Sequence, residues 1–170
     1  VNKTKARVYM RADPPGAASA DNPLPFLVMR LLQGLAAAVY TATHDDGSVN
    51  LDIIPTYAAR LAESGVRGVF VGGATGEGLS FTAAERIAVA ETWCTAARTH
   101  GLMSIVHVGA ACQKEAVMLA AAVPEADAVA AMAAPFTPPE SVEDLRDFLA
   151  PIAAAAGDRP FLFYDNPART

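Results

Sequence analysis

Five short apolar segments without polar alternation recur along the chain at intervals of roughly thirty residues. They span residues 35–40, 68–71, 103–108, 128–132 and 161–164. Continuous apolar runs are typical of strands that are buried on both faces, as in parallel sheets. Each interval holds a segment with helical periodicity, so the sequence predicts an α/β fold with a parallel sheet and right-handed crossovers.

Capping signals mark the expected helices, at about residues 50–65, 82–100, 113–123 and 141–156. Asn50 is expected to cap the first helix. Thr82 with Glu85 predicts a capping box at the start of the second helix, and Ser141 with Asp144 predicts another at the fourth. Two architectures satisfy this order of elements, an open doubly wound sheet or part of a (β/α)8 barrel, and periodicity alone does not choose between them.

The first 34 residues differ in composition from the rest of the chain. They carry five basic residues against two acidic ones, and their prolines cluster between Pro14 and Pro25. This shift predicts a poorly ordered N-terminal extension over residues 1–34 and a folded part over residues 35–170.

Composition excludes several classes of protein. With 52% hydrophobic and 18% charged residues in 170, the chain is typical of one globular domain. A net charge of −5 argues against a nucleic-acid surface, and no apolar run reaches the ~18 residues of a membrane span. Cys94 and Cys112 fit no metal-ligand spacing, so they are interpreted as reduced core thiols of a cytoplasmic protein.

A glycine-rich stretch follows the second apolar run. Residues 69–80 read Val-Phe-Val-Gly-Gly-Ala-Thr-Gly-Glu-Gly-Leu-Ser, and the Thr82 helix comes next. A strand, a glycine turn and a helix N-terminus together can form an anion site, because free N–H groups and the helix dipole converge there. The alternative is a tight turn whose glycines serve geometry only.

Polar groups collect where the expected strands end, which is where parallel α/β folds place their chemistry. They are Thr41, Thr43, Thr75, Glu77, His107, Thr137, Tyr164, Asp165 and Asn166. Tyr164 is the residue of acid–base type beside a proline-containing turn. His107, inside the third strand, is interpreted as a hydrogen-bonded core histidine, with a catalytic role as the alternative.

Several of these segments resemble a known family. Residues 73–77, Gly-Ala-Thr-Gly-Glu, are similar to the Gly-(Thr/Ser)-Thr-Gly-Glu signature of the dihydrodipicolinate synthase and N-acetylneuraminate lyase aldolases. Residues 164–167, Tyr-Asp-Asn-Pro, are similar to their Tyr-Asn-x-Pro or Tyr-His-x-Pro turn. The segments 76–80, 105–110 and 134–136 resemble the lyase branch in particular. The resemblance covers residues 35–170 in one register.

The resemblance implies strands 1–5 and helices 1–4 of a (β/α)8 barrel and a class I aldolase reaction without a cofactor or metal. In the family, a lysine on strand six forms a Schiff base with pyruvate or a sialic acid, and the protonated imine accepts the electrons of the breaking C–C bond. By position, Ala74 and Thr75 would bind the substrate carboxylate, and Tyr164 would donate and accept the proton. A homotetramer is implied for the full-length enzyme, without nucleic-acid or membrane partners.

Two features depart from the family pattern. The chain ends at Thr170, and its lysines, Lys3, Lys5 and Lys114, are not placed for the Schiff base. Ala74 stands where the family usually has a Thr or Ser hydroxyl.

We therefore interpret the chain as the N-terminal part of a lyase-like aldolase that is inactive as given. The alternatives are a dihydrodipicolinate synthase-like or other pyruvate-dependent aldolase, and a non-catalytic fragment or pseudoenzyme. Because a barrel closes only when its first and last strands pair, open edges are expected at residues 35–40 and 161–164, with an uncovered inner face between them.

Overall fold

The computed structural model describes residues 34–166 and the backbone of residues 7–10. In these parts of the chain, one sheet has the strand order β1–β6–β5–β4–β3–β2. Its strands are β1 (Arg7–Met10), β2 (Ala36–Ala38), β3 (Gly68–Val71), β4 (Met103–His107), β5 (Ala128–Ala131) and β6 (Phe161–Asp165). The strands β2 to β6 pair in parallel with their neighbours, as the apolar runs predict.

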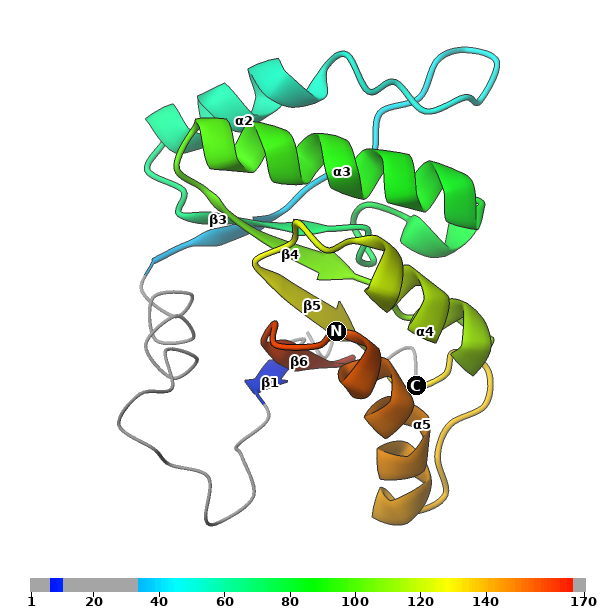
Figure 1. The fold of residues 1–170 in the computed structure, drawn as a ribbon. Helices are drawn as coiled ribbons and strands as arrows, with labels where there is room; N and C mark the ends of the chain where they lie inside the picture. The colour runs from blue at the N-terminus through cyan, green and yellow to red at the C-terminus, as the bar shows by residue number, and fades with distance from the viewer. Residues whose placement is uncertain (1–6, 11–33, 167–170) are drawn as a thin grey trace, which may run out of the picture.

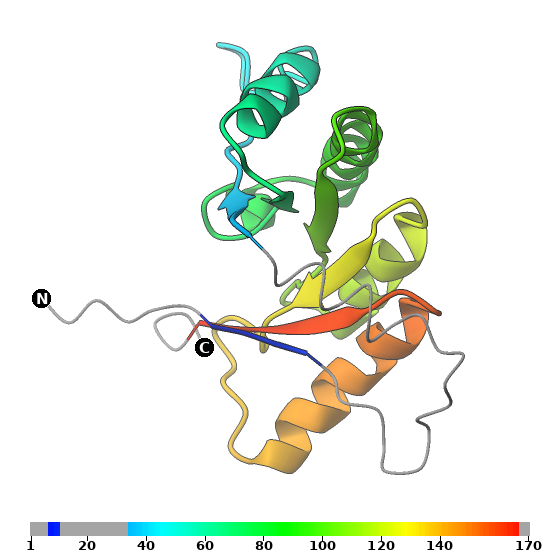
Figure 2. The ribbon, with the colours of Figure 1, turned by 90° about the vertical axis from the view of Figure 1, so that its left-hand side faces the viewer.

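The helices of the described residues all lie on the convex side of the sheet, which curves into an arc (Figures 1 and 2). They are α2 (Ile54–Glu63), α3 (Ala83–Thr99), α4 (Gln113–Ala122) and α5 (Val142–Ala155), with a short 3-10 helix, η1 (Gly78–Ser80), before α3. A doubly wound fold would carry helices on both faces. The one-sided arrangement therefore confirms the half-barrel, with five parallel strands and four helices.

Two of the predicted helix starts are confirmed and one is wrong. The Thr82 hydroxyl accepts from the backbone of Glu85, whose carboxylate accepts from Thr82 in return. The Ser141 hydroxyl accepts from the Asp144 backbone, which is half of the predicted box. Asn50 does not cap α2. Its Oδ1 accepts from the backbone of Asp52 in a local turn, and α2 begins three residues later than such a cap would require.

Side chains pack on both faces of the sheet. Toward the helices, the core includes Val69, Val106, Val129 and, from α3, Trp93. The inner face was predicted to be uncovered, but four of its residues are buried and form a cluster: Ile105, Ala128, Ala130 and Leu162.

The two cysteines are free but differ in burial. Cys94 is buried in the core between the sheet and the helices, as expected. Cys112 is exposed, because it lies just before the first turn of α4, so its assignment to the core is wrong.

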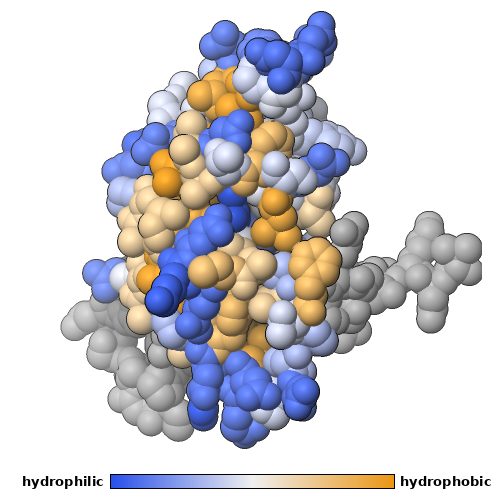
Figure 3. All heavy atoms as spheres, turned by 90° about the vertical axis from the view of Figure 1, so that its right-hand side faces the viewer, coloured by the Kyte–Doolittle hydropathy of each residue, from blue (hydrophilic) through white to orange (hydrophobic). Residues whose placement is uncertain are grey.

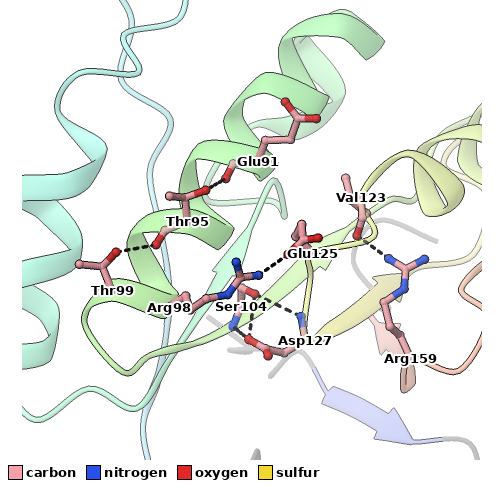
Figure 4. Close-up of polar contacts among 9 residues, drawn as sticks. All are labelled: Glu91, Thr95, Arg98, Thr99, Ser104, Val123, Glu125, Asp127 and Arg159. Carbon is pink, nitrogen blue, oxygen red and sulfur yellow. Dashed lines mark hydrogen bonds and ion pairs between the residues drawn. The ribbon is translucent and has the colours of Figure 1, made fainter.

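Hydrogen bonds between Ser104 and Asp127 join the N-terminal ends of β4 and β5 (Figure 4). The Asp127 carboxylate accepts from the Ser104 backbone at 2.8 Å and from its hydroxyl at 2.9 Å, and the Asp127 backbone donates back to that hydroxyl. Arg159 closes the end of α4 by donating to the carbonyls of Val123 and Ala120. Polar groups at this rim are thus paired with one another, which is typical of the stability face of a barrel.

The two edges of the half-barrel differ. Strand β6 was expected to be an open edge, and this is wrong, because β1 pairs with it antiparallel from Arg7 opposite Asp165 to Met10 opposite Leu162. Residues 7–10 therefore form a strand within the predicted extension. Residues 1–6 and 11–33 lie outside the described residues, and the boundary near Gly34 stays a prediction.

In the described part of the chain, no strand pairs with the outer edge of β2, as predicted. Leu35 and Tyr40 beside it are 67% and 68% exposed. Leu35 and Val39 direct backbone groups toward β3, so the alternating groups of Ala36 and Ala38 point away from it.

We expect the 170-residue chain to self-associate through this edge, because unpaired strand edges template pairing with another chain. An Ala38→Lys charge on the edge should shift sedimentation-velocity profiles toward the monomer. Ala121→Lys, the same change on an exposed position of α4, should leave assembly unaltered. A native chain that sediments as a monomer at every concentration would contradict the prediction.

Candidate functional site

A cavity of about 370 Å³ opens at the C-terminal ends of the strands. It is lined by Gly72, Gly73, Ala74, Glu77, Gly78, Leu79, Ser80, His107, Met132, Pro135, Phe136 and Asn166. In Figure 1 the arrowheads of the parallel strands point to this rim, and Figure 3 shows the rim face-on. Hydrophobic residues are exposed there in separate groups, with hydrophilic residues between them. A partly apolar hollow with a few polar groups at this rim is the usual location of a small-molecule site.

The glycine loop forms one wall and is tightly folded. A Cβ on Gly78 would collide with the carbonyl oxygen of Gly72, so no larger residue fits there. Glu77 adopts the left-handed conformation with a φ of 50°, which is uncommon outside glycine. The Thr41 hydroxyl at the end of the first parallel strand donates to the carbonyl of Gly76 at 2.8 Å. The packing of Gly78 against Gly72 and the hydrogen bond from Thr41 therefore hold the loop in one conformation.

The predicted anion site is formed only in part. Ala74 lines the cavity, while Thr75, half-buried next to it, is not among the lining residues. The Thr75 hydroxyl forms no hydrogen bond with the described residues, so it is available to a ligand. The α3 N-terminus does not reach the cavity, because η1 separates it from the glycines and Thr82 already caps it.

Three rings meet on the inner face beneath this loop. The ring of Tyr164 lies 5.7 Å from that of His107, nearly perpendicular to it, and 5.2 Å from that of Phe70. Strand β5 separates β4 from β6, and its residue opposite His107 is Ala130, whose side chain is a single methyl group. Asn166, which lines the cavity, donates from Nδ2 to the Tyr164 hydroxyl at 3.4 Å.

His107 is buried, with 4% of its surface exposed, and it lines the cavity. Neither ring nitrogen has a hydrogen-bond partner among the described residues, so its interpretation as a hydrogen-bonded core histidine is wrong. Burial and, to a smaller extent, the Arg86 charge lower the pKa of His107 to about 3, although the Gly72 backbone opposes the shift. The imidazole is therefore neutral at physiological pH.

Arg86 is the residue that sequence reasoning missed. It is buried on α3, and its Nη2 donates to the carbonyls of His107 at 3.1 Å and Gly109 at 2.9 Å. Burial lowers the pKa of Arg86, and the Glu115 charge on α4 opposes this shift. The spacing of Arg86 could have indicated its burial. It lies three residues before Val89 and seven before Trp93, on the buried face of the helix.

Of the other polar residues at the predicted strand ends, Glu77 lines the cavity but Thr43 and Thr137 do not. Among residues 34–166, no group of three or more His, Cys, Asp or Glu side chains could hold a metal ion. Nor does this region contain a helix that is long and apolar enough to cross a membrane.

The sequence of residues 31–170 matches the model of the dihydrodipicolinate synthetase family. The chain belongs to this family. Pig N-acetylneuraminate lyase is 43% identical to it over 142 residues, which are 82% of this chain and 44% of the relative. The chain thus spans about half the length of the curated relatives it matches.

Solved structures of the family share the fold. The N-acetylneuraminate lyase of Proteus mirabilis superposes with a TM-score of 0.72 at 36% identity, over 75% of this chain and 44% of the lyase. A catalytic lysine mutant of the Ruminococcus gnavus sialic acid aldolase gives a TM-score of 0.73 at 27% identity, over 80% of this chain and 45% of the aldolase. The family resemblance and the partial barrel are therefore confirmed, while the roles of Ala74, Thr75 and Tyr164 stay predictions.

The buried imidazole makes stability depend on pH. An unfolded histidine binds a proton below a pH of about 6.5, whereas His107 in the folded chain stays neutral down to about 3. Stability is therefore complete above pH 6.5 and falls as the pH drops toward 3. We expect the free energy of unfolding to fall by about 2 kcal/mol between pH 7 and pH 5 from this group alone.

Urea unfolding of dilute protein at both pH values measures this loss. His107→Gln should abolish most of it, whereas His100→Gln, at an exposed position after α3, should retain it. An equal loss in native and His107→Gln chains would mean that His107 is not the group responsible.

Proposed function

We propose that this chain supplies the carboxylate-binding and proton-transfer half of a Schiff-base aldolase of the N-acetylneuraminate lyase type. The parent reaction is the reversible cleavage of N-acetylneuraminate to pyruvate and N-acetylmannosamine. One observation carries the proposal: a cavity at the carboxyl ends of the parallel strands is bounded on one side by the glycine loop and on the other by Asn166, next to Tyr164.

Ala74 and Thr75 would hold the carboxylate of the 2-oxo acid. Ala74 lines the cavity wall, and the Thr75 hydroxyl beside it has no partner among the described residues. The loop geometry is fixed before any ligand arrives, because Thr41 and the packing of Gly78 against Gly72 hold it. Such a preformed site binds an anion without the cost of ordering a loop.

Tyr164 would move the proton. As the C–C bond breaks, the hydroxyl on the departing carbon loses its proton to become the aldehyde carbonyl, and the reverse reaction returns it. The Tyr164 ring is held by Phe70 and His107, and Asn166 orients its hydroxyl. A positioned acid–base group of this kind contributes roughly 10²–10⁴-fold to a rate.

The lysine amine that would form the Schiff base lies outside the described residues. In the mechanism that the family resemblance implies, a lysine condenses with the keto carbon and releases water. The protonated imine then takes the electron pair of the breaking bond and becomes an enamine. Lys114, the lysine that the structure describes, is exposed at the start of α4 and does not line the cavity.

We also propose a 2-oxo acid as ligand and a homotetramer as the full-length assembly, both from the resemblance, and a cytoplasmic location from the cysteine usage. A dihydrodipicolinate synthase-like condensation of pyruvate is the alternative within the family. An assay of the full-length protein with N-acetylneuraminate, following pyruvate release, separates the two. Pyruvate release supports the lyase, and its absence contradicts it.

The 170-residue chain should form no borohydride-stable adduct with pyruvate, because no lysine of the described residues lines the cavity. Mass spectrometry after reduction measures this directly. A specific adduct on the native chain would contradict the prediction, whichever lysine carried it, and its loss in Lys114→Arg would show that Lys114 reaches the keto carbon.

Restoring the family hydroxyl at position 74 should strengthen pyruvate binding by the full-length protein. A hydrogen bond to a charged group contributes about 1.5–3 kcal/mol, which is roughly tenfold to a hundredfold in affinity. Calorimetric titration of Ala74→Thr measures the gain. Ala84→Thr, the same change on an exposed position of α3, is the control. Unchanged affinity in Ala74→Thr would show that Thr75 and the loop backbone already suffice.

A further inference from the structure

A buried polar side chain of the cavity lining has hydrogen-bonding groups that no described residue uses. Both ring nitrogens of His107 are buried and unpartnered among the described residues. Such groups are rare in folded proteins, because each loses its bonds to water and gains nothing in return. In contrast, the buried Ser104 at the other end of the same strand is fully engaged with Asp127.

The imidazole is also held rigidly in place. Its backbone carbonyl accepts from Arg86, and the rings of Phe70 and Tyr164 pack against it. A Cβ on Gly109 would lie 2.8 Å from Cε1 and 2.9 Å from Nε2 of His107, so the ring occupies a notch that only glycine leaves open. The unused nitrogens therefore cannot find a partner by swinging toward another part of the protein.

We propose that His107 is a ligand-binding residue whose imidazole hydrogen-bonds to an uncharged oxygen of the molecule that occupies the cavity. Only the identity of that molecule, a 2-oxo acid, rests on the proposed function. The neighbouring Arg86 charge and the burial keep the ring neutral, so it offers one N–H donor and one acceptor rather than a positive charge. A carbonyl or hydroxyl oxygen suits such a group, whereas the carboxylate is left to Ala74 and Thr75.

The alternative is that His107 is only an imperfect core residue. The two explanations differ in what an apolar replacement does. His107→Leu removes a buried polar group without a partner, so it should raise the melting temperature of the ligand-free protein by about 2–4 °C in either case. It should weaken ligand binding only if the imidazole contacts the ligand.

The test uses calorimetric titration of the full-length protein with pyruvate and, separately, with N-acetylneuraminate. We expect His107→Leu to weaken binding of at least one probe roughly threefold to tenfold while the melting temperature rises. His107→Gln, whose amide reaches the place of Nε2, should restore most of the affinity. His100→Leu, at an exposed position, should match the native protein.

The outcomes separate this inference from the proposed function. Native affinity for both probes in His107→Leu overturns the inference, even if the protein cleaves N-acetylneuraminate. Loss of affinity in a protein that binds a probe without cleaving N-acetylneuraminate supports the inference and contradicts the proposed function. A native protein that binds neither probe contradicts both.

Discussion

The handedness of the strand crossovers is the constraint on which the rest of the molecule depends. Each right-handed connection adds the next parallel strand on the same side of the previous one, from β2 to β6 without a reversal. The helices of the described residues therefore all lie on one side, and the sheet curves away from them (Figure 2). Every parallel strand then ends at the same rim. Loops that are far apart in sequence, from the Gly72 loop to Asn166, meet there and enclose the cavity.

Polar groups are treated differently at the two rims of the half-barrel. At the N-terminal rim, Ser104, Asp127 and Arg159 satisfy one another or nearby carbonyls, and they hold strands and helices together. At the C-terminal rim, the ring nitrogens of His107 and the Thr75 hydroxyl have no hydrogen-bond partner among the described residues. This difference is typical of barrels, in which one rim stabilises the fold and the opposite rim carries the functional site.

Arg86 connects the packing of the fold to the chemistry of the rim. Its guanidinium holds the end of β4 by two carbonyls, and so it fixes the positions of His107 and Gly109. The same positive charge disfavours protonation of His107 and lowers its pKa. One buried residue thus sets both the place and the charge state of the imidazole.

The sequence by itself determined the order of the elements, because buried parallel strands read as continuous apolar runs and the Thr82 and Ser141 caps are local interactions. It also determined the glycine loop and the family, since motifs at fixed spacing survive without tertiary information. Tertiary structure alone decided the rest. Strand β1 covered an edge that the sequence left open. Arg86 reached carbonyls 21 and 23 residues away, and the ring of His107 on β4 met that of Tyr164 on β6, two strands away. Such contacts depend on which residues the curved sheet brings together, and no periodicity along the chain encodes them.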